Sequence, residues 1–549
     1  MDVQEQNYDQ LNEESQKKML RGSAWMTVGS FASRLLGAIY IIPWYLWMGQ
    51  QAELANNLFT KGYNIYALFL MISTAGIPGA IAKQISKYNS LNEYRVSKEL
   101  FKRTLMVMGL LGLVSSAFMF FGSPLLANLS GGNKDLIPVM KSLSVAVLIF
   151  PVMSAFRGFF QGNQDMMPSA LSQIIEQIAR VAYILVTAYV IMKVGSGDYV
   201  SAVTHATLAA FVGSFFALLL LLWFYKKYMP RLAALEAQSH NEIEIKPNEL
   251  IKEIVMEAIP FIFVGSAITI FKLIDQMTFE RFLGSYTNYT TEQVEKLFTL
   301  FSGNPDKLTM ITISIATSLA IAGLPLITEL YTKQKFQELA KQLSDNIQLF
   351  FFVMIPSTVG MVLLSDELNT VFYRSDDLGA SLLRQATYVG VVLGFYILVS
   401  SILQGIYGNN KAIRFLVIGL LIKLICQFPF IYYLESYGPN LATAVGFLVA
   451  SGLTIYEIYK MTHFDVALTL RRTLLIIILS LMMLLGAFLV QQLLYFFLSP
   501  ASKGPAFAIV MIVGLIGGSI YGYLVLKLRL ADKLLGSRMA GLRRKLRIR

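Results

Sequence analysis

Charged side chains inside long apolar segments are the residues of this sequence best placed to do chemistry. Five bases lie within such segments: Arg34, Arg157, Arg180, Lys272 and Lys423. Two carboxylates share these segments: Glu176 and Asp275. Placing a charge at the centre of a bilayer costs about 2.5–3.5 kcal/mol on insertion scales, so each of these residues needs a partner or a function.

Some of these charges can neutralise one another within a helix. Glu176 and Arg180 are four residues apart, and Lys272 and Asp275 are three apart, so each pair would share a helix face. Arg157 lies close to the end of its apolar run and can extend its guanidinium towards the membrane surface. For these residues a structural role and a binding role both stay open.

Arg34 and Lys423 have no acidic residue within four positions. A guanidinium inside a protein needs an anion or a water-filled cavity, and the planar fork of arginine suits the oxygens of a phosphate. We therefore predict that the bases hold an anionic cargo, most simply a phosphate or a pyrophosphate. Glu176 and Asp275 are the buried carboxylates available to bind Na+ or H+ for ion coupling, if they are not simply ion pairs.

The elements that carry these charges are apolar helices. The chain has 549 residues, of which 55% are hydrophobic and 15% charged, whereas soluble domains are about 25% charged. We predict an all-α, polytopic membrane protein with about 14 transmembrane helices. The expected spans are about 23–47, 62–82, 104–127, 138–160, 168–192, 200–225, 254–278, 308–328, 347–364, 383–404, 412–434, 440–460, 473–498 and 505–527.

The distribution of Lys and Arg predicts the orientation in the membrane. The polar, mixed-charge start MDVQEQNYDQ is unlike a signal peptide. Basic clusters at residues 17–21, 83–103 and 226–231 and the tail LRRKLRIR fall on one side if both termini are cytoplasmic. We thus expect a multi-pass membrane protein whose two termini are cytoplasmic. The net charge of +12 then reflects topology and attraction to anionic headgroups, and we expect no nucleic-acid partner.

An internal repeat is visible in short matching motifs. AGIP at 75–78 recurs as AGLP at 322–325, and Gln161–Gly162 recurs as Gln404–Gly405. Arg180 and Lys423 each follow the second glycine by 18 residues. These matches predict two six-helix lobes related by a parallel repeat, followed by two additional helices. The predicted regions are an N-terminal tail 1–21, an N-lobe 22–228, a linker 229–249, a C-lobe 250–462, two further helices 463–528 and a basic tail 529–549.

Enzymatic chemistry finds little support. The sequence has no Walker-type glycine loop, so we expect a transporter without ATPase activity. The single cysteine and three scattered histidines predict neither a metal site nor a cofactor. Energy would then come from an ion gradient or from the membrane potential.

The run RGFFQGNQDMMPSALSQIIEQIARV at 157–181, with FASRLLG in the first span and GIPGAIAKQISKY after the second, resembles the YtgP and SpoVB-type polysaccharide transport proteins. These form the MurJ-like branch of the MOP exporter superfamily. The resemblance implies two lobes around a cationic cavity that opens alternately to each side. It also implies lipid II, an undecaprenyl pyrophosphate carrying the peptidoglycan precursor, as cargo, and a groove along the last two helices for its lipid tail.

The resemblance carries over unevenly to single residues. Arg34 matches the first-span arginine of the family, and Lys307 falls close to the basic position at the start of the eighth span. Two further basic positions of the family fall at Tyr40 and near Leu70, which are uncharged. The full set of expected substrate-binding residues is therefore Arg34, Arg157, Arg180, Lys272, Lys307 and Lys423.

Three other functions stay open at this point. The first is a flippase for another lipid-linked polysaccharide unit, because no motif specifies the glycan. The second is a multidrug or cation exporter of the same superfamily, although such a protein should favour acids over bases in its spans. The third is a scaffold for cell-wall or sporulation enzymes, which would not need Arg34. We expect the protein to act as a monomer.

Overall fold

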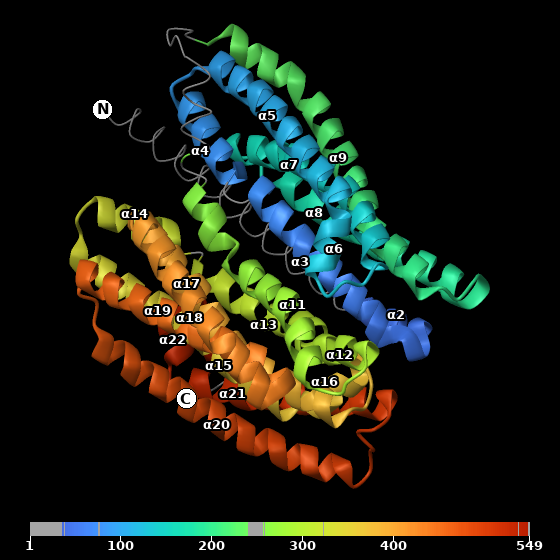
Figure 1. The fold of residues 1–549 in the computed structure, drawn as a ribbon. Helices are drawn as coiled ribbons and strands as arrows, with labels where there is room; N and C mark the ends of the chain where they lie inside the picture. The colour runs from blue at the N-terminus through green and yellow to red at the C-terminus, as the bar shows by residue number, and fades with distance from the viewer. Residues whose placement is uncertain are drawn as a thin grey trace. The chain divides into compact units, whose positions relative to one another are not determined.

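The computed structural model describes residues 36–546 apart from residues 38, 75–76, 240–255, 257–258, 322 and 536, and Arg34 therefore lies outside it. All regular elements in the described ranges are helical (Figure 1). In the first half they are α2 (Ile41–Met48), α3 (Ala52–Thr74), α4 (Ile77–Ser90), α5 (Tyr94–Phe121), α6 (Ser123–Leu129), α7 (Leu136–Gly162), α8 (Met167–Tyr189), α9 (Tyr199–Ala237) and α11 (Ala267–Tyr286).

The second half continues with helices of similar length. They are α12 (Thr291–Phe298), α13 (Asn304–Ile321), α14 (Leu324–Thr332), α15 (Phe336–Leu363), α16 (Ser365–Phe372), α17 (Asp377–Gly405), α18 (Asn409–Leu434), α19 (Gly438–Thr462), α20 (Val466–Tyr495), α21 (Lys503–Lys527), α22 (Leu530–Leu535) and α23 (Ser537–Lys545). Contacts between residues divide the chain into two units, Met1–Met277 and Thr278–Arg549, with the division inside α11.

The prediction of a helical membrane protein is confirmed. Among the described residues, nine helical segments are long and apolar enough to cross a membrane, and a pair bent by 50°, Ile259–Gly265 with α11, would make a tenth. One of the nine, Asn409–Thr462, contains both α18 and α19. At 1.5 Å per residue it is far longer than a hydrocarbon core of about 30 Å, so it accounts for two crossings. The count of 14 stays a prediction.

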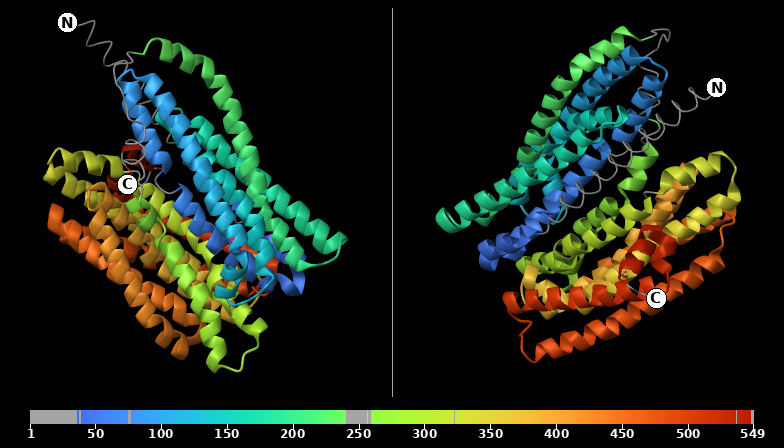
Figure 2. Two further views of the ribbon diagram at one scale, coloured as in Figure 1. Left: turned by 45° about the horizontal axis from the view of Figure 1, so that its top comes forward. Right: turned by 180° about the vertical axis from the view of Figure 1, so that it is seen from behind.

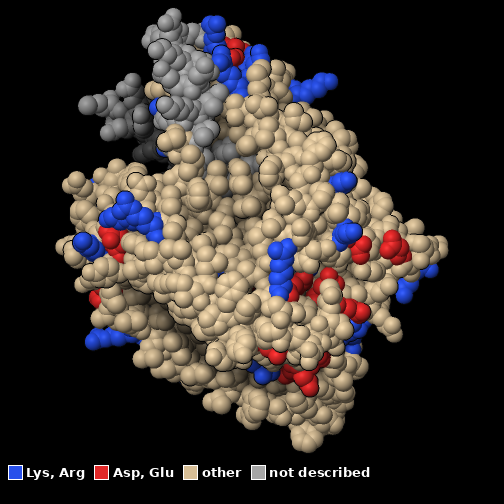
Figure 3. Space-filling model, viewed as in Figure 1, with Lys and Arg blue, Asp and Glu red and all other residues tan. Residues whose placement is uncertain are grey.

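Helix ends follow local sequence signals. The Asp198 side chain accepts hydrogen bonds from the first backbone N–H groups of α9, and Asp465 does the same for α20. Thr290 and Gln293 form a reciprocal capping box at the start of α12. Most helices extend beyond their apolar runs; α9, for example, continues to Ala237, into the predicted linker. On the face shown in Figure 3, most of the surface is uncharged and the charged side chains lie in small groups.

Two antiparallel helix pairs are central to the positions of the intramembrane bases. In the first unit α8 packs along α9, and in the second α18 packs along α19 (Figures 1 and 2). Glycines allow the close approach: a Cβ on Gly213 would lie 2.5 Å from the carbonyl oxygen of Glu176, and a Cβ on Gly419 would lie 2.5 Å from that of Gly446. The first pair carries Glu176 and Arg180, and the second carries Lys423.

Candidate functional site

Two arginines and one glutamate meet inside the first unit. The Arg157 Nη2 lies 2.8 Å from Glu176 Oε2, and the Arg180 Nη2 lies 2.9 Å from Glu176 Oε1. The carboxylate therefore bridges guanidiniums from two helices, α7 and α8. The expected pairing of Glu176 with Arg180 is confirmed. The Arg157 guanidinium also bonds to Glu176, a partner that lies nineteen residues further along the chain.

Arg157 makes further hydrogen bonds with neighbouring serines, whereas one donor of Arg180 has no partner among the described residues. The Arg157 Nε donates to Ser172 Oγ at 2.9 Å, and Ser169 Oγ donates to the Arg157 carbonyl. The Arg180 Nε is buried and has no hydrogen-bond partner within the described ranges. Two positive charges share one negative charge, so the cluster keeps a net charge of +1 together with an unused donor.

Three tyrosines form an aromatic wall near the cluster. Tyr40, Tyr63 and Tyr66 lie within electrostatic range of the Arg180 guanidinium. The Tyr63 ring stacks on Phe59 at a centroid distance of 4.4 Å, and Tyr66 meets Tyr63 edge-on at 5.5 Å. Tyr40 occupies the position where the family resemblance led us to expect a base. The positively charged Arg180 of α8 therefore lies close enough to Tyr40 to interact with it electrostatically.

The bases of α11 and α13 lie apart from this cluster in sequence. Lys272 is half-buried and Asp275 is buried, and both make polar or electrostatic interactions. Their neighbour Gln276 accepts from Asn64 Nδ2 at 3.0 Å and donates to Ser130 Oγ at 2.9 Å. Lys307, in the first turn of α13, is half-buried beside Asp306.

Lys423 is fully buried in the second unit. Its Nζ donates to Thr443 Oγ1 on α19 at 2.6 Å. Gln427, one turn further along α18, donates to Thr278 Oγ1 at 3.1 Å. The structure therefore unites Arg157, Glu176 and Arg180 in one cluster and holds Lys423 by a hydroxyl.

Sequence reasoning missed a second buried lysine. Lys61 on α3 is fully buried and takes part in interactions, and its carbonyl accepts from Gln276 Nε2 at 3.3 Å. The predicted second span begins one residue later, at about 62, and therefore does not include Lys61. A helix begun at Ala52, where α3 starts, would have included it.

An apolar groove lies in the second unit, between α13, α15, α16, α20 and α21. Its volume is about 530 Å³. The lining is mostly aliphatic and aromatic, with hydroxyl groups on Thr312, Ser357 and Tyr521 and three glycines of α21. Its lining residues are Thr312, Phe352, Val353, Pro356, Ser357, Gly360, Met361, Leu363, Leu364, Leu368, Met483, Ala487, Val510, Val513, Gly514, Gly517, Gly518 and Tyr521.

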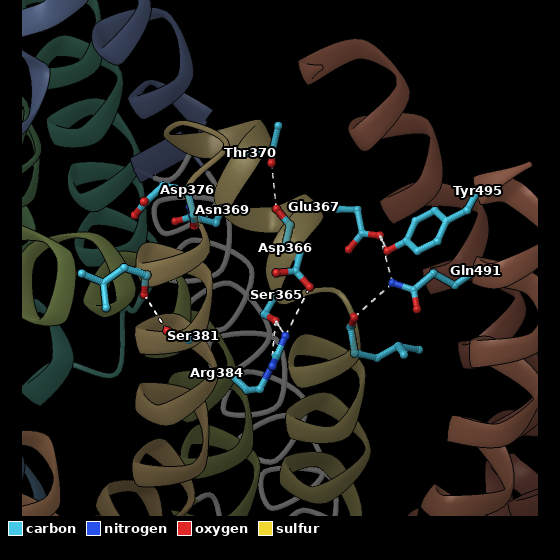
Figure 4. Close-up of polar contacts among 12 residues, drawn as sticks. Ser365, Asp366, Glu367, Asn369, Thr370, Asp376, Ser381, Arg384, Gln491 and Tyr495 are labelled. Carbon is cyan, nitrogen blue, oxygen red and sulfur yellow. Dashed lines mark hydrogen bonds and ion pairs between the residues drawn. The ribbon is translucent and has the colours of Figure 1, made fainter. Parts of the chain in front are cut away.

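A polar latch joins α16 to α20 near one end of this groove (Figure 4). Glu367 is fully buried, and its Oε1 accepts hydrogen bonds from Gln491 Nε2 at 2.9 Å and from the Tyr495 hydroxyl at 2.5 Å. Gln491 also donates to the carbonyl of Leu363, which lines the groove. Arg384 of α17 bonds instead to Ser365 and Asp366. The latch fixes α20 against the rest of the second unit.

Comparison with known proteins gives the class of this chain. The sequence profile described as "Polysaccharide biosynthesis protein" matches residues 19–331, and the MatE profile matches residues 306–432. The chain is 34% identical over 542 residues to the lipid II flippase MurJ of Bacillus subtilis (strain 168), covering 96% of this chain and 98% of that protein. It is 24% identical over 423 residues to stage V sporulation protein B of the same organism, covering 74% and 77%.

A solved structure supports the fold. The structure described as "Lipid II flippase MurJ, inward closed conformation" superposes with a TM-score of 0.62 at 14% identity, covering 93% of this chain and 99% of that one. The chain belongs to the polysaccharide biosynthesis protein family, in the MurJ-like branch of the MOP superfamily. It is a multi-pass membrane transporter, and the recognition made from residues 157–181 is confirmed.

Proposed function

We propose that this protein is an alternating-access flippase that moves lipid II, the undecaprenyl pyrophosphate-linked peptidoglycan precursor, from the inner to the outer leaflet of the bacterial cytoplasmic membrane. The observation that carries the proposal is the Arg157–Glu176–Arg180 cluster, which, counted over the described residues, has two guanidiniums for one carboxylate and one donor without a partner. Phosphate oxygens suit such guanidiniums. The 34% identity to a lipid II flippase supports the choice of cargo.

The pyrophosphate contacts would come from the bases, Arg157 and Arg180 first among them. Arg34, Lys272, Lys307 and Lys423 complete the proposed set, and Glu176 and Asp275 are the proposed ion-pairing or ion-coupling carboxylates. The groove along α20 and α21 would take the polyprenyl tail, because its lining is apolar and four of its residues are glycines. We further propose that both termini are cytoplasmic and that the protein acts as a monomer.

A depletion experiment tests the cargo. In a bacterium depleted of its own lipid II flippase, expression of this chain should restore lipid II to the outer leaflet, as measured by its accessibility to an impermeant probe. Accumulation of lipid II on the inner leaflet despite a folded, membrane-inserted protein would contradict the proposal.

A flippase for another lipid-linked polysaccharide is the second candidate. The likeness to stage V sporulation protein B and the description of the family favour it. Its signature would be normal lipid II movement without this chain and a different lipid-linked glycan trapped on the inner leaflet.

A further inference from the structure

The carboxylate of Glu176 occupies the place that an anionic ligand of Arg157 and Arg180 would take. Each carboxylate oxygen accepts one N–H, the first from Arg157 and the second from Arg180. Each guanidinium carries five N–H donors and commonly binds a carboxylate through two of them. Glu176 therefore neutralises the pair with few hydrogen bonds, and Arg180 Nε has no partner among the described residues.

The single negative charge of Glu176 does not balance the two positive charges of Arg157 and Arg180. In the part of the chain that the structure describes, two guanidiniums bond to one carboxylate, and the nearby Tyr40, Tyr63 and Tyr66 are phenols. A diphosphate has more acceptor oxygens and more negative charge than a carboxylate, so it can satisfy both arginines and the unused donor at once. The side chains keep 11–19% of their surface exposed, whereas the Arg180 Nε itself is buried, so a diphosphate would reach that donor only if the Glu176 side chain moved aside.

The second repeat has a glycine at the position equivalent to Glu176. Glu176 follows Gly162 by fourteen residues, and Gly419 follows Gly405 by fourteen. The base that follows four residues later is Arg180 in the first repeat and Lys423 in the second. Lys423 is fully buried and held by the Thr443 hydroxyl. A base at this position can thus be held without a glutamate one turn before it.

We propose that Glu176 is a resident counter-ion, which holds Arg157 and Arg180 while the protein is empty and is displaced from them by the diphosphate of the cargo. This inference rests on the proposed function. Its physical reason is the cost of leaving two buried guanidiniums without an anion. In the empty protein, Glu176 supplies the negative charge that the two guanidiniums need. It accepts only one hydrogen bond from each arginine, so a diphosphate can replace it.

The test compares pyrophosphate binding by the purified full-length wild type and by Glu176→Gln, at constant ionic strength, using isothermal titration calorimetry. Glutamine keeps the shape and removes the competing charge, so we expect the variant to bind at least about tenfold more tightly, since hydrogen bonds to charged groups are worth more than one decade of affinity. Glu236→Gln is the matched control, because Glu236 pairs with Lys98 near the end of α9, and its affinity should equal that of the wild type.

Unchanged or weaker binding by a folded Glu176→Gln protein would overturn the inference. If the variant does not fold, infrared difference spectroscopy of the wild type is the alternative test. Adding pyrophosphate should change the carboxylate bands of the wild-type spectrum, and unchanged bands would overturn the inference. The proposed function fails separately. If the wild type restores lipid II movement but Glu176→Gln binds pyrophosphate no more tightly than the wild type, only the counter-ion inference is refuted. If Glu176→Gln binds pyrophosphate more tightly but the wild type does not restore lipid II movement, only the proposed cargo is refuted.

Discussion

Arg180 is the residue with the greatest predicted effect on transport. It contributes the guanidinium with the unused donor, and it stands beside the tyrosine wall. Replacing it with alanine should lower lipid II translocation at least about tenfold, because a lost charge-assisted bond is worth about 1.5–3 kcal/mol. Lysine keeps the charge and loses the fork, so Arg180→Lys should be intermediate.

The measurement is restoration of outer-leaflet lipid II in flippase-depleted cells, normalised to the amount of protein in the membrane. Arg103→Ala is the matched control, since Arg103 forms the same type of pair with Glu99 four residues away, but on a more exposed surface. Full activity of Arg180→Ala would remove this residue from the binding set.

Lys423 is expected to behave differently, because its ammonium is buried against a hydroxyl. Thr443→Val removes one acceptor, 2.6 Å from Nζ, and should lower the free energy of unfolding by about 1–3 kcal/mol. Lys423→Met with Thr443→Val should recover part of that loss, because the buried charge that lost this acceptor is then also removed. Thermal unfolding of the purified variants measures both. A double variant less stable than Thr443→Val alone would contradict this account.

At the scale of helices, the approach of α9 to α8 sets the position of Glu176. A Cβ on Gly213 would meet the Glu176 carbonyl oxygen at 2.5 Å and the Arg180 Cβ at 3.2 Å, so Gly213→Ala must push the two helices apart. We expect lower transport together with a lower melting temperature. Gly452→Ala on α19 is the control, because its Cβ would meet nothing within 4 Å. Equal effects of the two substitutions would argue against a close-packed site.

The role of the groove in binding the lipid tail can be tested with substitutions that we expect to leave the fold intact. Gly518 lines the groove and a Cβ there would meet nothing within 4 Å, so Gly518→Phe should fit on α21 while filling the space of the proposed tail. Gly522→Phe, one turn further on, also meets nothing within 4 Å and does not line the groove. We expect translocation to fall for the first variant alone, at equal melting temperature. Equal translocation by both variants would exclude this groove as the path of the tail.

At the scale of the molecule, periodic and local features were predictable from sequence, whereas contacts between helices were not. The apolar runs gave the helical membrane fold, and the i, i+4 spacing of Glu176 and Arg180 gave their pairing. The bond from Arg157 to Glu176 joins residues 19 apart on different helices, which no spacing rule predicts. The same holds for the burial of Glu367, which depends on Gln491 and Tyr495.

The arginine cluster lies within Met1–Met277, and the apolar groove lies within Thr278–Arg549. Each would recognise its own part of the proposed cargo. A diphosphate without a lipid tail should therefore compete with lipid II at the cluster alone, and a polyprenyl chain without a diphosphate should compete at the groove alone. Inhibition that depends on the number of isoprene units would then report on the groove, and inhibition independent of that number would report on the cluster.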